Sequence, residues 1–170
     1  LNEQMRGGLH MDEFEILGTE IDIHSKKIER FAFQYGYTLE TAYEVTLDIF
    51  ASFHNQFRDV AEVESILPAV YKLAIQKLVQ TERLLSSVEG VFAFEEDAEL
   101  HLQIVKLDEK YRLPFILLQF HNLMYVQIAS ILDLSTIEVE TNIQTAKALL
   151  SGHHLEKRLE LLGKSYDRLP

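Results

Sequence analysis

Near the C-terminal end of the sequence lies a run of short polar side chains of the types that contact DNA bases. These side chains are Thr141, Asn142, Gln144, Thr145 and Lys147. Asparagine and glutamine amides can pair with an adenine edge, a threonine methyl can contact the methyl group of thymine, and lysine binds phosphate. The same residue types also occur on the solvent-facing side of ordinary helices. A polar surface without a ligand is therefore the alternative interpretation.

The segment that must position these side chains is predicted to be a helix-turn-helix. Apolar periodicity predicts helices over residues 111–120 and 125–132. A three-residue turn over 133–135 then leads into a helix over about 136–150. Two helices joined by so short a turn place the second helix in the DNA major groove. The residues expected to face inward are Val126, Ile128, Ala129, Leu132, Val139, Ile143, Ala146 and Leu150.

Net charge argues against ordinary DNA binding by this segment. Proteins usually bind DNA by neutralising phosphates with lysine and arginine. The chain instead has 27 acidic and 16 basic residues and a formal net charge of −11. No segment of the sequence forms a basic patch. The second helix of the predicted helix-turn-helix carries Glu138 and Glu140.

Composition predicts an all-α protein. The 170 residues are 47% hydrophobic, which is enough for a packed core, and they include only three prolines. A strand-like run over residues 91–94 is too short and isolated to form a sheet. The absence of cysteine excludes disulfides and fits a cytoplasmic protein. No apolar run approaches the length of about 18–20 residues that crosses a bilayer.

The predicted organisation is two small helical domains joined by an acidic linker. Residues 1–10 are expected to be a polar tail or an added remnant outside the fold. The first domain then covers residues 11–85, the linker 86–106, and the second domain 107–170. The linker is placed by its serines, its glycine and its cluster of carboxylates. The last twenty residues are expected to form an amphipathic helix whose leucines either pack on the domain or bind a partner.

The first domain is expected to contain a helix or helix pair over residues 14–35 and helices over residues 38–59 and about 64–85. Gly36 and Tyr37 break the first helix, and Thr38 is a candidate cap for the second. The residues expected in the core are Ile16, Ile21, Ile28, Phe31, Phe33, Ala42, Val45, Ile49, Phe50 and Phe53. The third helix is expected to run through Tyr71, Leu73, Ala74, Leu78 and Val79.

Residues 107–150 resemble region 4 of bacterial sigma factors of the extracytoplasmic-function class, the promoter-recognition subunits of RNA polymerase. The spacing agrees without a gap at Leu107, Lys110, Tyr111, Arg112, Leu117, Leu118, Phe120, Leu123, Tyr125, Ile128, Ala129, Ile131, Leu132, Ser135, Val139, Ile143, Ala146 and Leu150. The resemblance implies that Thr141, Asn142, Gln144, Thr145 and Lys147 approach the −35 promoter element. This sequence departs from the family at several positions that are normally basic, where it has Glu140, Asn142, Gln144 and Thr145.

Residues 40–50 and 71–74 resemble region 2 of the same family. The resemblance implies that the polymerase-binding residues are Glu44, Leu47, Asp48 and Phe50. It further implies that the residues near the −10 element are Tyr71, Lys72, Lys77 and Arg83. The alternative is that Tyr71 is a core residue and that the three cations are ordinary surface. Three positions depart from the family, which has Trp, Asn and Asp where this sequence has Ala69, Gln76 and Gln80.

The resemblance predicts a sigma factor whose partners are core RNA polymerase and promoter DNA, with an anti-sigma factor as a further candidate partner. A second hypothesis is a degenerate sigma-like protein that binds a protein partner but no promoter. A third, ranked last, is a helical interaction module unrelated to polymerase. No enzymatic activity, cofactor or metal is expected, because no nucleophile elbow, phosphate loop or metal-binding histidine pattern is present. His153 and His154 are expected to be a surface pair.

Overall fold

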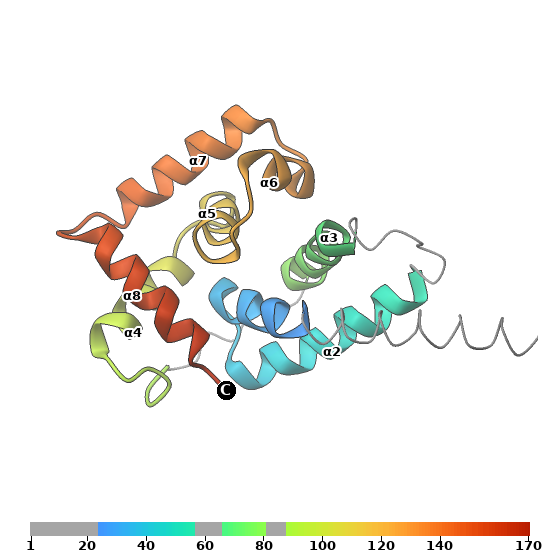
Figure 1. Ribbon diagram of the computed structural model, residues 1–170, viewed down its shortest axis with the longest axis horizontal. Helices are drawn as coiled ribbons and strands as arrows, with labels where there is room; N and C mark the ends of the chain where they lie inside the picture. The colour runs from blue at the N-terminus through green and yellow to red at the C-terminus, as the bar shows by residue number, and fades with distance from the viewer. Residues whose placement is uncertain (1–23, 57–65, 81–87) are drawn as a thin grey trace, which may run out of the picture.

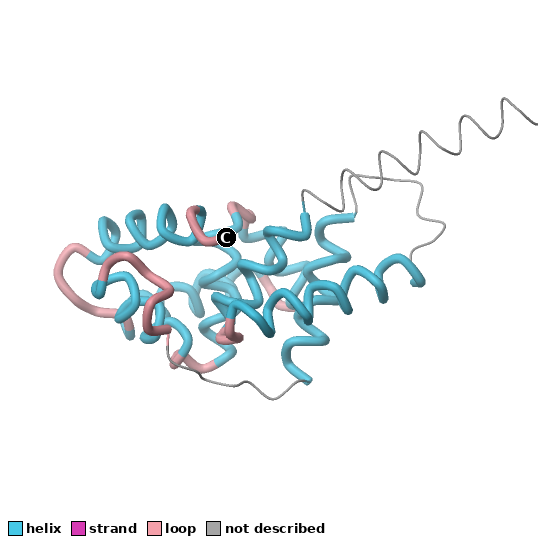
Figure 2. The backbone as a smooth tube through the Cα atoms, turned by 90° about the horizontal axis from the view of Figure 1, so that it is seen from below, coloured by secondary structure: helices cyan, strands magenta, loops and turns pink. Residues whose placement is uncertain are grey.

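Residues 24–56, 66–80 and 88–170 are described in the structure, a computed structural model of the chain. The described residues form helices joined by turns and contain no strand, which confirms the all-α prediction (Figures 1 and 2). Residues 24–35 are helical. The helices that follow are α2 (Leu39–Gln56), α3 (Ile66–Gln80), α4 (Glu95–Val105), α5 (Glu109–His121), α6 (Tyr125–Leu132), α7 (Thr136–Leu149) and α8 (Leu155–Asp167).

A glycine turn separates the helix over residues 24–35 from α2. Gly36 has φ of 133°, a conformation that side chains disfavour, so the first helix ends there. Thr38 then caps α2, because its Oγ1 accepts a hydrogen bond of 3.0 Å from the backbone N–H of Thr41. The Tyr37 hydroxyl donates to the carbonyl of Leu78 at 2.8 Å, which joins this turn to α3. Both the break and the cap agree with the sequence prediction.

Most of the core expected in the N-terminal half is confirmed. The buried residues are Ile28, Phe31, Phe33, Ala42, Val45, Ile49, Phe53, Tyr71, Leu73, Ala74 and Leu78. Phe50 is only half-buried, and Val79 is exposed on the outer side of α3. Ile16 and Ile21 lie outside the described residues, as do the polar tail and the predicted helix ends at residues 14, 59 and 85.

Helix α4 occupies much of the segment expected to be an acidic linker. Its buried face includes Leu100, His101 and Ile104, and it packs against α8. Glu95 and Glu96 stand in its first turn, where negative charge favours a helix N-terminus. The cluster of carboxylates therefore begins a packed helix. Residues 95–105 form this helix, whereas their charge had suggested an exposed linker.

Helices from the two halves of the chain share one buried core. We call the surface where residues 24–80 meet residues 88–170 the seam. At the seam the Phe33 ring stacks on His101 with centroids 4.4 Å apart, and α3 contacts α6. The Tyr71 hydroxyl lies 2.7 Å from Nδ1 of His121. The charged rim adds a hydrogen bond from Arg30 Nη2 to the carbonyl of Asp167, at 3.0 Å.

The C-terminal helix, α8, divides its leucines between the core and the solvent. Leu159 and Leu162 are buried, Leu155 is half-buried, and Leu161 is exposed. The sequence left open whether these leucines pack or form a surface. Because Leu159 and Leu162 are three residues apart, they share the helix face that packs on α4, while Leu161 points away from it.

Candidate nucleic-acid interface

Helices α6 and α7 form the helix-turn-helix that the sequence predicted. α6 covers the predicted residues, and α7 ends one residue earlier than expected, at Leu149. Asp133 adopts the left-handed conformation with φ of 58° and ends α6. Ser135 and Glu138 then form a capping box at the start of α7. The Glu138 N–H donates to Ser135 Oγ at 3.2 Å, and the Ser135 N–H donates to Glu138 Oε2 at 3.0 Å.

The interior of the helix-turn-helix agrees with prediction at most positions. Ile128, Ala129, Val139, Ile143, Ala146 and Leu150 are buried, and Leu132 is half-buried. Val126 is 69% exposed, so its assignment to the inward face was wrong. The reason is helical geometry: Val126 lies two residues before Ile128, which places it about 200° around the helix axis.

The outward face of α7 presents few groups that bind DNA. The exposed residues that share this face are Ile137, Glu140, Thr141, Gln144 and Ala148. Ile137 is 74% exposed. Of the predicted contact residues, only Thr141 and Gln144 lie on this face, and no lysine or arginine accompanies them. The face is therefore polar and acidic with an apolar end.

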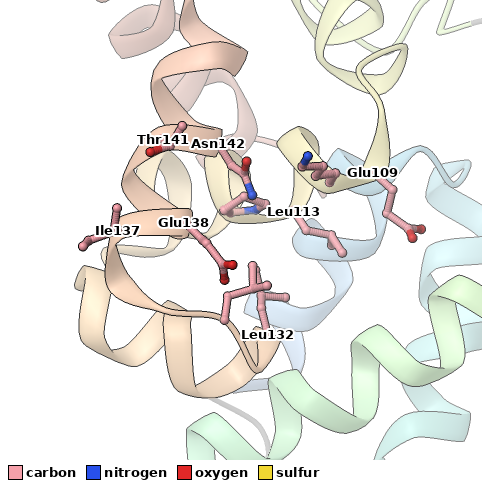
Figure 3. A pocket seen from close by; sticks show the side chains of 10 residues that line it. Glu109, Leu113, Leu132, Ile137, Glu138, Thr141 and Asn142 are labelled. Carbon is pink, nitrogen blue, oxygen red and sulfur yellow. The ribbon is translucent and has the colours of Figure 1, made fainter.

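The other predicted contact residues of α7 are engaged or buried. The Thr145 hydroxyl donates to the carbonyl of Thr141 at 3.0 Å. Lys147 Nζ pairs with Glu156 at 3.2 Å, so the cation of α7 faces the start of α8. Asn142 is only 7% exposed and lies on the side of α7 that faces α5 (Figure 3). Its amide is therefore not presented to a DNA groove in this conformation.

A pocket of about 600 Å³ lies between α5, the turn and the first half of α7 (Figure 3). Its walls combine apolar side chains with a few polar groups at the rim. The lining residues are Glu109, Lys110, Leu113, Pro114, Leu132, Leu134, Ile137, Glu138, Thr141 and Asn142. The pocket extends from the exposed Ile137 to the buried residues Leu113 and Asn142. It therefore lies beside the face of α7 that is expected to meet DNA.

On α3, the residues expected near the −10 element do not share a face. Tyr71 is fully buried, so its ring has no exposed face that could stack on a base. The same burial raises the pKa of its hydroxyl. The alternative that Tyr71 is a core residue is what the structure shows. Lys72 is exposed and Lys77 half-buried. Five residues of helix separate the two lysines by about 140°. Arg83 lies outside the described residues.

On α2, the residues expected to meet polymerase lie mainly on the open side of the helix. Glu44, Leu47 and Asp48 are exposed, and Phe50 is half-buried. Tyr43, which the sequence analysis did not select, is exposed beside Leu47, four residues away on the same face. The surface made by Tyr43, Glu44, Leu47 and Asp48, which we call the α2 face, combines two large apolar side chains with two carboxylates.

Sequence reasoning missed a buried polar cluster at the seam. His121 lies between two partners, with Nε2 at 2.7 Å from Oε1 of Gln34 and Nδ1 at 2.7 Å from the Tyr71 hydroxyl. These distances fit a neutral ring that donates to Gln34 and accepts from Tyr71. Burial lowers the pKa of His121 to about 3, with further lowering by Lys27 and Arg30. No local pattern marks such a cluster, because its three members come from distant parts of the chain.

No group of three or more potential metal-ligating side chains is found among the described residues. His153 and His154 are exposed, as expected of a surface pair, with ring centroids 6.4 Å apart. Within residues 24–56, 66–80 and 88–170, no helix has the length and apolar character needed to span a membrane.

Comparison with known proteins finds a similarity within the second half of the chain. Residues 97–150 match the family model of sigma-70, region 4. The match begins within α4 and includes all of α5, α6 and α7. It starts before residue 107, where the sequence analysis placed the beginning of this domain. No curated protein matches the chain. This segment is thus similar to the region of sigma-70 factors named by the model, and it carries the helix-turn-helix described above.

Proposed function

We propose that the chain is a divergent sigma factor of the extracytoplasmic-function class, which binds core RNA polymerase in the cytoplasm and directs it to promoters. One observation carries the proposal: the segment that matches sigma-70 region 4 folds into a capped helix-turn-helix whose second helix has an open outer face. This is the geometry through which such helices enter a major groove. An anti-sigma factor remains a candidate partner.

The α2 face supports the proposed attachment to polymerase. Leu47 and Tyr43 are each 55% exposed and lie four residues apart on one helix face, so they form a small contiguous apolar patch that a protein partner could cover. Glu44 and Asp48 border them and would attract a basic surface on the polymerase. Phe50 is half-buried, and we assign it to packing α2 against the core. In this proposal polymerase supplies the phosphate contacts that the acidic chain lacks.

The proposed promoter contacts are fewer than the family resemblance implies. At the −35 element, Thr141 and Gln144 are placed to contact bases, while Thr145 and Lys147 lie at the edge of that face. A contact from Asn142 requires its buried amide to turn outward. At the −10 element we retain Lys72, Lys77 and Arg83 as phosphate-binding candidates. Tyr71 contributes only if the seam opens and releases its ring.

The first test mixes the full chain with core RNA polymerase and a random promoter library, followed by sequencing of the bound DNA. We expect a two-part motif to be enriched. Leu47→Glu should reduce polymerase binding by about tenfold or more, because it places a charge in an apolar contact. Leu161→Glu is the matched control, since Leu161 is similarly exposed at 46% but lies on α8. Equal effects of both variants would contradict the assignment of the α2 face.

A second candidate function is supported by the outward face of α7. Its exposed Ile137, its Glu140 and its lack of lysine and arginine suit a protein partner better than a phosphate backbone. In this hypothesis the chain is a degenerate sigma-like regulator that binds polymerase or an anti-sigma factor without recognising promoter DNA. In the library experiment, it predicts polymerase binding without any enriched motif.

A charge substitution on α7 distinguishes the two hypotheses. Under the degenerate hypothesis, Glu140→Lys combined with Thr145→Arg should create DNA affinity that the unmodified chain lacks, with a salt dependence of up to about two phosphate contacts. Fluorescence anisotropy against promoter-length duplexes measures both quantities. Glu96→Lys with Gln103→Arg makes the same change in charge on exposed positions of α4 and is the control. If the unmodified chain already binds DNA tightly, the degenerate hypothesis fails.

A further inference from the structure

A second pocket, of about 520 Å³, lies on the seam and contains none of the residues assigned to polymerase or promoter binding. Its walls come from the helix over residues 24–35, the beginning of α3, the end of α5, α6 and the last turns of α8. We call it the seam pocket. Its volume is within the range of about 300–1,000 Å³ that is usual for small-molecule sites.

The seam pocket is cationic in a strongly acidic protein. Lys27 and Arg30 line it, and the carboxylate among its lining residues is that of Asp167 at the rim. Arg30 approaches Asp167 through Nη1 and Nη2, at 3.5 Å from the carboxylate and 3.0 Å from the carbonyl. Each of these nitrogens carries a second N–H, which an anion could accept in the planar geometry that guanidinium groups favour.

Two amide side chains add hydrogen-bond donors to this charge. The oxygen of Gln34 accepts from His121, and the oxygen of Gln127 accepts from the backbone N–H of Met124 at 2.9 Å. Because both oxygens are engaged, the group that each amide can offer a ligand is its NH2. Lys27, Arg30 and these two amides thus all offer donors to the pocket, which suits a ligand rich in acceptor oxygens.

The electrostatic effect of the two cations extends to the His121 ring, which lines the pocket. Lys27 and Arg30 both lower the pKa of His121, in addition to the larger effect of burial. The positive potential of Lys27 and Arg30 therefore reaches His121 at the floor of the pocket. Because the His121 ring is neutral, the positive charge that would attract an anion comes from Lys27 and Arg30. An anion bound between the cations would offset their effect on His121, which makes this ring a reporter of occupancy.

Gly163 in α8 keeps one side of the pocket open. Glycine inside a helix is less favourable than alanine by about 1 kcal/mol. A Cβ at this position would meet only the Phe120 ring, at 3.8 Å, which is ordinary contact. Close packing therefore does not require glycine here. What glycine provides is space, because any longer side chain would extend into the pocket that Gly163 lines.

We propose that the seam pocket binds a small phosphorylated molecule about the size of a nucleoside monophosphate, with its phosphate between Lys27 and Arg30. A phosphate monoester carries about −1.5 to −2 charges at neutral pH, which suits two cations better than a carboxylate does. The pocket is much larger than phosphate alone, and Leu67 and Phe120 offer apolar wall to an organic group. Since the walls come from both sides of the seam, the ligand holds the two halves together.

The test measures binding to the full chain by calorimetry and thermal shift. The probes are the four common nucleoside monophosphates, glucose 6-phosphate, adenosine and inorganic phosphate. We expect at least one phosphorylated compound to bind and to raise the melting temperature, because a ligand that binds only the folded state stabilises it. Adenosine should not bind. Binding by none of the phosphorylated compounds would overturn the proposal. If inorganic phosphate bound as tightly as the organic phosphates, the claim that the pocket recognises an organic group would be overturned.

Variants locate the site. Arg30→Gln should weaken the affinity by about tenfold or more and Lys27→Gln by about fivefold, because each removes a charge-assisted contact. Lys26→Gln is the control, since Lys26 is an exposed neighbour that does not line the pocket. Gly163→Leu should abolish binding by filling the space. Ligand addition should also shift the imidazole signals of His121 in NMR spectra. Unchanged affinity in Lys27→Gln and Gly163→Leu would overturn the site. None of these readouts requires polymerase, so they are independent of the proposed function.

Discussion

Replacing Arg112 by methionine is expected to lower the free energy of unfolding by about 3 kcal/mol, a large share of the roughly 5–15 kcal/mol that stabilises a typical domain. Arg112 is fully buried, and its Nη1 donates to the carbonyls of Val105 and Leu107, at 2.6 and 2.9 Å. Its guanidinium also lies 4.5 Å from the centre of the Tyr35 ring. Methionine fills a similar volume but leaves both carbonyls without this donor.

Arg112 thereby fixes the turn between α4 and α5 and attaches it to the seam. Tyr35 reinforces this contact, because its hydroxyl donates to Glu109; burial, followed by this carboxylate, raises the pKa of Tyr35 to about 12. Urea denaturation measures the effect, with Lys110→Met as the control at an exposed position two residues away. A loss of about 3 kcal/mol corresponds to a fall in melting temperature of about 6–12 °C. Equal stability of the two variants would show that the buried guanidinium contributes little.

Acidification from pH 7.5 to pH 5 is expected to destabilise the protein by about 4 kcal/mol through two buried histidines. Burial lowers the pKa of His101 from 6.5 to about 4, and burial with the cations Lys27 and Arg30 lowers that of His121 from 6.5 to about 3. Below about pH 6.5 the unfolded chain therefore binds more protons than the folded chain. The free energy of unfolding falls through this range and continues to fall until the pH reaches the folded-state pKa values.

The contacts of both histidine rings support the expected loss of stability on acidification. His101 stacks on Phe33 and has Nδ1 at 2.7 Å from the Tyr166 hydroxyl, while His121 is held by Tyr71 and Gln34. Urea midpoints at a series of pH values would measure the slope. The double variant His101→Gln with His121→Gln should show a much flatter dependence, whereas His153→Gln with His154→Gln should retain it. A flat profile in the unmodified protein would contradict the assignment of neutral buried rings.

Local sequence determined the helix-turn-helix almost completely. Apolar spacing placed α6 at its observed residues and α7 to within one residue, and the capping pair Ser135 and Glu138 fixes where α7 begins. The break at Gly36 and the cap at Thr38 were predictable for the same reason. These features depend on residues at most four positions apart, so the chemistry that creates them is visible in a short stretch of sequence.

Tertiary structure decided which side chains remain available for function. Tyr71 and Asn142 have residue types suited to DNA, but packing against α5 and its neighbours buries both. The carboxylates at 95–97 suggested a linker, but they begin a helix that packs on α8, and Asp97 itself accepts a hydrogen bond from Ser165 of α8. The seam pocket and the His121 cluster join residues that lie far apart in the chain. Burial and long-range pairing depend on how helices pack, and helical periodicity specifies only that a face is apolar, without specifying which helix will cover it.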